Sequence, residues 1–231
     1  MTNQDNSGRV AVVVGAGSGL GQATALKLAA LGMRVVAVDR NEQGLESLPS
    51  EIARENVDAT DPSTAGPLFE RIASDVGTPE VLVNTVGAFD LGDAMTTTPD
   101  HLRLMLDVNL GAALWLSQAV APYMQQKGSG AIVHITSRPG LEPAAGMAAY
   151  AVSKAALVHL TRVLDLELRP LGIRVNAVAP QLILTPKNQA MLPADVLAHA
   201  VTPEAIADVV AFLVSDAAAP VSGAILPAYG A

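Results

Sequence analysis

Hydrophobic residues along this chain alternate between short continuous runs and longer stretches of helical period. The short runs are rich in β-branched residues and have the length of buried strands. They lie at residues 10–14, 34–38, 81–84, 131–135, 174–178 and 224–227. The longer stretches carry apolar residues three or four positions apart, as amphipathic helices do. They lie at residues 20–31, 67–76, 99–126, 149–171 and 203–215.

This alternation predicts an α/β fold, because continuous apolar strands separated by helices are typical of a parallel sheet covered on both faces. Right-handed crossovers then give a Rossmann-type, doubly wound sheet. No linker, charge run, repeat or low-complexity segment interrupts the pattern. We therefore expect a single domain over residues 1–231, beginning with a polar tail at 1–8.

Composition and charge exclude several classes of function. The 14 Lys and Arg residues against 22 Asp and Glu residues give a formal charge of −8 with no basic cluster, which argues against nucleic-acid binding. The chain has no cysteine and its four histidines are widely spaced, so we expect no metal site. The polar start is unlike a signal peptide, and the uncharged stretch 108–126 contains polar residues and a proline. We expect a buried or interface helix there, no membrane association and a cytoplasmic location.

A glycine-rich turn, residues 15–21 (GAGSGLG), connects the first predicted strand to the first helix. Glycines there allow a tight turn and let main-chain N–H groups approach a pyrophosphate at the helix N-terminus. No Lys-Ser or Lys-Thr pair follows, which excludes a Walker-type phosphate loop. An ordinary βα connection is the alternative interpretation of the turn taken alone.

Asp39 strengthens the dinucleotide interpretation, because it follows the second predicted strand, 18 residues after Gly21. A carboxylate at this place can accept hydrogen bonds from both ribose hydroxyls of NAD and repels the 2′-phosphate of NADP. The next residue, Arg40, offers a guanidinium that could bind that phosphate instead, but the glycine turn holds no basic residue to assist it. We expect NAD as the cofactor, with NADP as the alternative.

Tyr150 and Lys154 stand four residues apart near the start of a predicted helix, which places them on one face, one turn apart. An ammonium near a phenol stabilises the phenolate, so the pair can serve as a general acid/base. A ring at the core edge beside a solvated amine is the alternative interpretation. Ser137 follows the strand 131–135 at its carboxyl end, where ligands bind in open α/β sheets, and its hydroxyl can bond a substrate oxygen.

Taken together, the motifs resemble those of the short-chain dehydrogenase/reductase family, and the chain is similar to the 3-oxoacyl-carrier-protein reductases. The family's glycine turn matches residues 14–21 (VGAGSGLG), its Asn-Asn-Ala-Gly strand end matches 84–87 (NTVG), and its nicotinamide-binding segment matches 176–185 (NAVAPQLILT). The resemblance covers nearly the whole chain. It implies about seven parallel strands in the order 3-2-1-4-5-6-7.

The resemblance also implies which residues form the site. The catalytic residues by this match are Asn109, Ser137, Tyr150 and Lys154. The cofactor-binding residues are Gly15, Ser18, Gly19, Leu20, Asp39, Arg40, Asp58, Ala59, Asn84, Gly87, Tyr150, Lys154, Pro180, Ile183 and Thr185.

Four departures from the family pattern stand out. Val14 replaces a threonine, and Thr85 with Val86 replaces an Asn-Ala pair. Gln181 replaces a glycine beside the expected nicotinamide, which puts an amide side chain near the substrate. The segment 186–202 is a shortened substrate lid compared with relatives.

The activity implied is NAD(P)-dependent interconversion of a secondary alcohol and a ketone. Tyr150 would exchange a proton with the substrate oxygen, Lys154 would lower the phenol pKa and hold the ribose, and Ser137 would position the substrate. Asn109 would bind a water that links Lys154 to solvent. The alternatives are a non-catalytic NAD(P)-binding sensor or scaffold, and a dehydration or epimerisation that uses bound cofactor.

Substrate and partners are less constrained by the sequence. Apolar residues near the expected pocket favour a hydrophobic or cyclic substrate: Phe89, Leu91, Leu141 and Met147. Arg138 is either a ligand for an acidic substrate group or a solvated loop residue. We expect a homodimer or homotetramer, built on the helices at 99–126 and 149–171. The apolar stripe on the first of these comprises Ala112, Ala113, Leu116, Ala119 and Val120.

Overall fold

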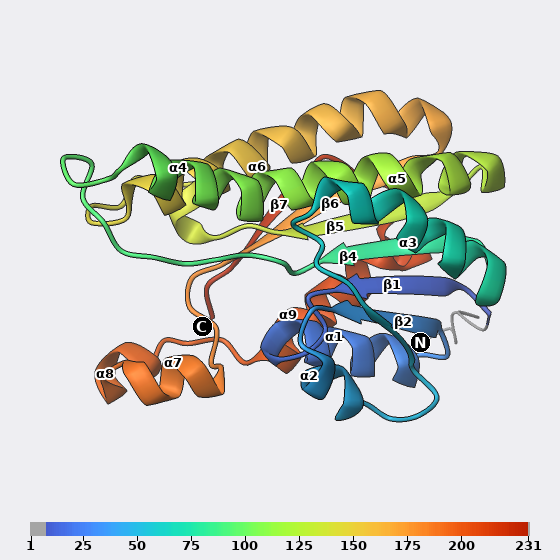
Figure 1. The fold of residues 1–231 in the computed structure, drawn as a ribbon, viewed down its shortest axis with the longest axis horizontal. Coiled ribbons are helices and arrows are strands. Elements are labelled where there is room, and N and C mark those ends of the chain that lie inside the picture. Colours follow the sequence, from blue (N-terminus) through green and yellow to red (C-terminus); the bar gives the residue numbers. More distant parts are fainter. Residues whose placement is uncertain (1–7, 231) are drawn as a thin grey trace.

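A computed structural model describes residues 8–230 of the protein, so the first seven residues of the predicted polar tail lie outside the described part. Seven parallel strands form one sheet in the order β3-β2-β1-β4-β5-β6-β7, which confirms the predicted order (Figure 1). The strands are β1 (Val10–Val14), β2 (Arg34–Asp39), β3 (Ala53–Asn56), β4 (Pro79–Asn84), β5 (Gly130–Ile135), β6 (Ile173–Pro180) and β7 (Ile225–Ala228).

The central strands are those with the most continuous apolar runs. Strand β1 has five buried residues, and it pairs with β2 on one side and β4 on the other. Successive strands are therefore added on one side of β1 up to β3 and on its other side from β4 onward. Such a switch point opens a crevice at the carboxyl ends of the strands. This crevice is where the predicted ligand site belongs.

Helices cover both faces of the sheet (Figure 1). Two hydrophobic clusters form, one on each face, and the larger helices contribute a buried side to one or the other. One face carries α1 (Gly19–Ala30), α2 (Glu42–Glu46) and α9 (Pro203–Val214). The other carries α3 (Pro62–Asp75), α4 (Pro99–Leu106), α5 (Ala112–Lys127) and α6 (Ala148–Leu168). Two short helices, α7 (Pro186–Met191) and α8 (Ala194–Leu197), lie away from the sheet in the lid segment.

Helix α3 begins five residues earlier than the predicted 67–76. Asp61 caps it by accepting a hydrogen bond from the Ser63 amide, and Pro62 occupies the first turn, where a proline costs no hydrogen bond. Pro67, which the sequence suggested as the helix start, lies inside the helix instead. The N-cap at Asp61 therefore fixes the start of α3, and the later proline does not.

The predicted helix at 99–126 runs from Pro99 to Lys127 without a break in helical structure, and a π-helical turn at Asp107–Gly111 divides it into α4 and α5. Within the described residues it is the one helix long and apolar enough to cross a membrane by length and composition. Its inner side packs against the sheet, as in a core helix. Its π-helical turn shifts the helix register at Asn109, beside the predicted site.

The apolar stripe predicted as a subunit surface packs inside the chain instead. Ala112, Ala113, Leu116 and Val120 are all fully buried within one chain, in contact with the sheet layer. The apolar side of a helix can be buried against only one surface, and here that surface is the sheet of the same chain. The stripe therefore gives no support for a homo-oligomer, which stays a prediction.

Candidate active site

The glycine turn after β1 packs against the neighbouring strands through its main chain. The amides of Gly15 and Ala16 both donate to the Val38 carbonyl oxygen, at 2.8 and 3.1 Å. A Cβ on Gly21 would lie only 1.9 Å from the Gly15 carbonyl oxygen, so no side chain fits there. Thr85, one of the departures from the family pattern, donates its hydroxyl to the carbonyl oxygens of Val14 and Gly15, at 2.8 and 3.2 Å. Thr85 therefore ties the end of β4 to the turn.

The N-terminus of α1 is suited to a phosphate group. Its N-cap, Ser18, makes no side-chain hydrogen bond to the helix, and the first turn has no acidic residue. The first amides of a helix need an acceptor, and an uncapped N-terminus at a glycine turn attracts an anion. Because α1 starts at the carboxyl edge of the sheet, these residues fit the pyrophosphate of a dinucleotide.

The adenosine end of the expected cofactor site is organised by two carboxylates. Asp39 accepts hydrogen bonds from the amides of Gly17 and Asn41, both at 2.8 Å, and a Cβ on Gly17 would meet its carboxyl carbon at 2.9 Å. The guanidinium of Arg40 forms an ion pair with the Asp58 carboxylate, with 3.4 Å between Nη1 and Oδ2. This carboxylate also accepts two hydrogen bonds from Thr60, which hold the pKa of Asp58 below its usual range.

At the far end of the site, β6 leads into the segment that the resemblance assigned to the nicotinamide. Pro180 ends β6, and Ile183 forms a parallel bridge with Val201 that closes the base of the lid. The Thr185 hydroxyl accepts the Asn188 amide as the N-cap of α7. The Thr185 methyl group lies 3.3 Å from where a Cβ on Gly19 would be, so this segment reaches the glycine turn.

Lys154 is buried, with its ammonium pointing to the end of β5. Nζ donates to the Ile135 carbonyl oxygen at 2.9 Å, and burial lowers the pKa of Lys154 to about 8. The Thr136 hydroxyl donates to the Lys154 carbonyl oxygen at 3.0 Å, and Gly140 packs so closely that a Cβ there would lie 2.9 Å from that carbonyl. Thr136 and Gly140 were not among the predicted site residues, although Thr136 directly precedes Ser137 and Gly140 follows it by three residues.

Asn109 is fully buried in the π-helical turn, and its side chain makes hydrogen bonds at both ends. Oδ1 accepts the Ala88 amide at 2.9 Å, while Nδ2 donates to the Ala88 carbonyl oxygen and to Ser153 Oγ, both at 3.0 Å. Ser153 in turn donates to the Tyr150 carbonyl oxygen at 2.8 Å. Ser153, which no sequence motif indicated, connects the Asn109 amide to the turn that carries Tyr150.

Gly87 explains how two of the predicted residues meet. A Cβ at this position would lie 3.0 Å from both Asn109 Oδ1 and Lys154 Nζ. The two polar groups therefore converge on the bare main chain that follows β4. Asn84, at the end of the same strand, is buried and accepts the Val86 amide at 3.0 Å, which shapes this approach.

Tyr150 lies half-buried in the first turn of α6, with its ring edge-on to Phe89 at 5.0 Å between centroids. Burial raises the pKa of the Tyr150 phenol, and the neighbouring Ser137 hydroxyl opposes that shift. The resemblance implied that Lys154 lowers this pKa, and that role stays a prediction. In this structure Lys154 Nζ donates to the Ile135 carbonyl oxygen at the end of β5.

Ser137 lies two residues after the end of β5 and is buried, and its hydroxyl makes no hydrogen bond of normal length and angle among the described residues. A buried hydroxyl without such a bond is costly, so the group indicates a binding partner outside the chain. The Ser137 hydroxyl lies near enough to the Tyr150 phenol for a weak interaction that opposes the rise of its pKa. A substrate oxygen between these two groups could bond both.

His134, next to the site on β5, gives the protein a testable pH dependence. The side chain is fully buried, its Nε2 lies 3.4 Å from Ser117 Oγ, and burial together with the Lys154 charge lowers the pKa of His134 to about 4. Between pH 6.5 and pH 4 the unfolded chain binds a proton at this histidine while the folded chain does not. Protonation of His134 therefore costs no free energy of unfolding above pH 6.5, and it lowers the free energy of unfolding progressively as the pH drops to about 4.

The expected loss from this one group is about 3 kcal/mol. Urea unfolding between pH 4 and pH 7 should show a shallower decline for His134→Gln than for the unmodified protein. The exposed His159→Gln is the control and should keep the original slope. Equal slopes in the His134 variant and the unmodified protein would contradict this assignment.

Comparisons with known proteins agree with this architecture. A family model described as short chain dehydrogenase matches residues 9–195. The D-threitol dehydrogenase of Mycolicibacterium smegmatis is 32% identical over 95% of this chain and 90% of its own length. The L-xylulose reductase of Mus musculus is 34% identical over 97% of this chain and 96% of its own length.

A similar solved structure is a 7α-hydroxysteroid dehydrogenase complexed with NADH and 7-oxoglycochenodeoxycholic acid. Its TM-score is 0.92 with 32% sequence identity, covering 97% of this chain and 94% of that one. The family model spans well over half of the chain, and the relatives span nearly all of it. The protein belongs to the short-chain dehydrogenase family of NAD(P)-dependent oxidoreductases that act on alcohols and ketones.

Proposed function

We propose that the protein interconverts a secondary alcohol and a ketone, with Tyr150 as the acid/base and NAD as the preferred cofactor. The observation that carries this proposal is the buried Ser137 hydroxyl, which makes no hydrogen bond of normal length and angle and lies near the Tyr150 phenol. These groups lie at the carboxyl edge of the sheet, where the uncapped N-terminus of α1 offers a phosphate site. Together they support a substrate oxygen bound next to a dinucleotide.

Each side chain has a distinct part in the proposed reaction. When bound, the nicotinamide supplies the hydride acceptor or donor at the substrate carbon. The Ser137 hydroxyl donates a hydrogen bond to the substrate oxygen and holds it against Tyr150. The phenol gives its proton to that oxygen during ketone reduction and takes the proton back during alcohol oxidation. Because the pKa of Tyr150 is raised, the resting phenol is ready for reduction, and we expect alcohol oxidation to speed up as the pH rises.

Lys154 and Asn109 support this chemistry from inside the chain. With a pKa of about 8, the Lys154 side chain is mostly an ammonium at neutral pH, and it can donate to ribose hydroxyls. The Asn109 side chain already makes hydrogen bonds with Ala88 and Ser153. We therefore propose that the main chain of the π-helical turn, and not this side chain, binds the water that links Lys154 to solvent. Such turns are frequent at functional sites.

The remaining cofactor contacts follow from the position of each residue. Gly15, Gly19 and Leu20 present the turn and the first amides of α1 to the pyrophosphate. Ala59, next to Asp58, lines the adenine side, and Pro180 with Ile183 lines the nicotinamide side.

We infer further that residues 186–202, with α7 and α8, act as a short lid over the substrate within one domain. A cytoplasmic homo-oligomer is also part of this proposal.

The preference for NAD follows from the carboxylate of Asp39. Two main-chain amides fix this carboxylate at the end of β2, where the 2′-phosphate of NADP would meet a like charge. Such a contact at a partly exposed site costs on the order of 2 kcal/mol, or about 30-fold in binding. We expect kcat/KM with NAD to exceed that with NADP by at least tenfold.

Replacing Asp39 with asparagine tests this preference. The substitution keeps the shape of the side chain and removes the charge that would repel the 2′-phosphate, and it leaves the contact of Arg40 with Asp58 in place. We expect the ratio of kcat/KM for NAD over NADP to fall at least tenfold in Asp39→Asn. A ratio that does not move would assign the cofactor preference to other residues.

The experiment that tests the proposed function is a turnover assay. The nicotinamide absorbance is followed with NAD and with NADP, over a panel of secondary alcohols and ketones. Turnover on at least one substrate is expected. Absence of turnover over the panel, with NADH still quenching the fluorescence of Trp115, would favour a sensor or scaffold that binds the cofactor without using it.

A further inference from the structure

The residues that follow Ser137 form a polar cluster that the proposed mechanism does not use. Arg138 lies one residue, about 3.8 Å along the chain, beyond Ser137. Arg138 lies three residues beyond Ile135, and Gln181 lies three residues beyond Val178, with which Ile135 pairs in the parallel register of β5 and β6. The amide of Gln181 donates to the Ala228 carbonyl oxygen at 3.4 Å, which brings Tyr229 alongside. Three adjacent strand ends therefore bring Arg138, Gln181 and Tyr229 together at the carboxyl edge.

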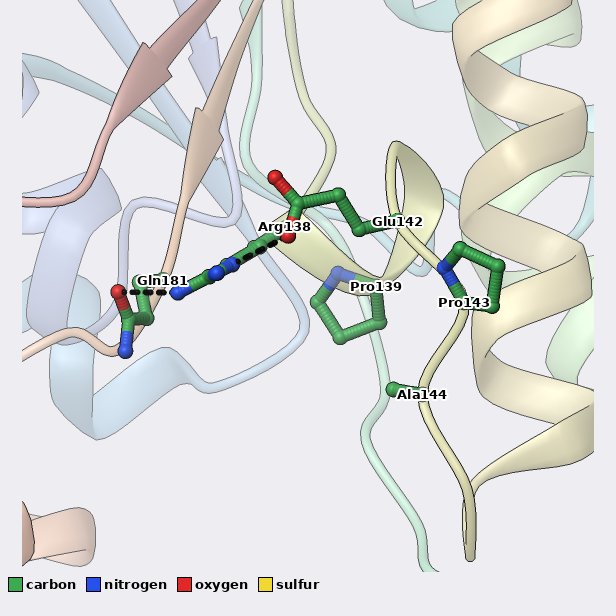
Figure 2. A pocket seen from close by; sticks show the side chains of 6 residues that line it. All are labelled: Arg138, Pro139, Glu142, Pro143, Ala144 and Gln181. Atoms are coloured by element: carbon green, nitrogen blue, oxygen red, sulfur yellow. Dashed lines mark hydrogen bonds and ion pairs between the residues drawn. The ribbon is translucent and has the colours of Figure 1, made fainter.

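Three side chains contact the Arg138 guanidinium. Its Nε donates to Glu142 Oε2 at 2.8 Å, and its Nη1 donates to Gln181 Oε1 at 3.1 Å (Figure 2). Its guanidinium carbon lies 5.1 Å from the centre of the Tyr229 ring, within the range of a cation–π contact. The guanidinium plane is thereby fixed although roughly two-fifths of the side chain is exposed (43%).

A cavity of about 300 Å³ opens beside this cluster. Arg138, Glu142 and Gln181 line it together with Pro139, Pro143 and Ala144, as Figure 2 shows. That volume is at the lower end of small-ligand pockets. Arg138, which lines this cavity, directly follows Ser137 in the chain, so the cavity lies at the same edge of the sheet as the Ser137 hydroxyl.

We propose that Arg138, Glu142 and Gln181 form a subsite for the additional hydroxyl groups of a small neutral polyol, or of the matching hydroxyketone. The inference rests on the proposed function and names its substrate class. Among the described residues, Arg138 Nη2, Gln181 Nε2 and Glu142 Oε1 have no hydrogen-bond partner. The cluster thus offers two donors and one acceptor, and a hydroxyl group both donates and accepts.

Two other substrate classes suit the subsite less well. The carboxylate of an acidic substrate only accepts hydrogen bonds and would meet the like charge of the Glu142 carboxylate, which already neutralises Arg138. A purely apolar substrate would cover three polar side chains without satisfying them. The subsite therefore favours a polyol over the hydrophobic substrate, and over the acidic substrate for Arg138, that the sequence suggested.

The test compares substrates of equal carbon number. With NAD, kcat/KM is measured for the pentitols xylitol, ribitol and arabitol, for 2-pentanol, which lacks the extra hydroxyls, and for the corresponding pentonates. We expect the best pentitol to exceed 2-pentanol and the pentonates by about 100-fold. Gln181→Leu should lower the ratio of pentitol to 2-pentanol at least tenfold. Glu142→Gln should lower the ratio of pentitol to pentonate at least tenfold, because it exposes the Arg138 charge to the acid.

Asp100→Asn is the matched control, since it breaks an exposed arginine–carboxylate pair on α4, and it should leave both ratios within twofold. Unmodified protein that prefers 2-pentanol or a pentonate, or ratios that stay constant in both subsite variants, would overturn the polyol subsite. Calorimetric titration of the best pentitol into the Tyr150→Phe protein with NADH separates the two proposals. Binding without turnover in the unmodified protein would overturn the proposed function alone, and turnover of 2-pentanol without pentitol binding would overturn the subsite alone.

Discussion

Replacing Tyr150 with phenylalanine is expected to lower kcat by about two to four orders of magnitude, the range typical of a lost general acid/base. The ring keeps its edge-on contact with Phe89, so the packing of the first turn of α6 is retained. Only the phenol oxygen beside Ser137 is removed. The expected loss is therefore in the chemical step and not in folding or in cofactor binding.

Steady-state kinetics, NADH fluorescence titration and thermal unfolding check this expectation on the same preparation. The dissociation constant for NADH should stay within about threefold and the melting temperature within about 2 °C. Loss of NADH binding in step with kcat would mean that Tyr150 binds cofactor without acting on the substrate. Retention of full activity would remove Tyr150 from the mechanism.

Replacing Gly21 with alanine is expected to destabilise the fold by about 3 kcal/mol or more and to abolish NADH binding. The added Cβ would lie 1.9 Å from the Gly15 carbonyl oxygen and 2.8 Å from the Thr85 hydroxyl. Main-chain atoms form the first obstacle, so the turn must separate from α1 to make room. Both the core contact of α1 and the phosphate site at its N-terminus depend on that turn.

Gly66→Ala is the matched control for this clash. Gly66 lies on the exposed side of α3, and a Cβ there meets nothing within 4 Å. Alanine is the better helix former, so this variant should gain about 0.5–1 kcal/mol. Urea unfolding and NADH titration of both variants decide the matter, and a Gly21→Ala protein with normal stability would show that the turn is looser than described.

The strands with continuous apolar runs could be predicted from the sequence because burial on both faces leaves that pattern. Strand β1 has the predicted bounds, and β5 differs by one residue. Strand β3 (Ala53–Asn56, AREN) was missed, since an edge strand pairs on one side only and its alternate residues are exposed. Its polar sequence has no strand period to detect.

Motifs local in sequence gave a usable list of candidate residues, but not their contacts. The spacing of Tyr150 and Lys154 on one helix predicted one face, but it did not predict that the Lys154 ammonium donates to the Ile135 carbonyl oxygen at the end of β5. The direction of a long, flexible side chain depends on which carbonyl groups are in reach. Only the packing of α6 against β5 decides that.

Contacts between distant segments were beyond the sequence for the same reason. The hydrogen bond from Asn109 to Ser153 depends on a π-helical turn, which has no sequence signature of its own. The cluster of Arg138 with Gln181 depends on strand register, which neither segment shows separately. The buried stripe on α5 illustrates the opposite error, because an apolar helix face predicts burial without saying what covers it.

The central claim is that this site transfers hydrogen between a carbinol carbon and the nicotinamide. It is tested most directly with a secondary alcohol carrying deuterium at the carbinol carbon, incubated with NAD and the unmodified protein. Mass spectrometry of the recovered cofactor should show one deuterium on the reduced nicotinamide ring, and none with Tyr150→Phe over the same time. Cofactor recovered without deuterium, while the substrate is dehydrated, epimerised or unchanged, would contradict the account.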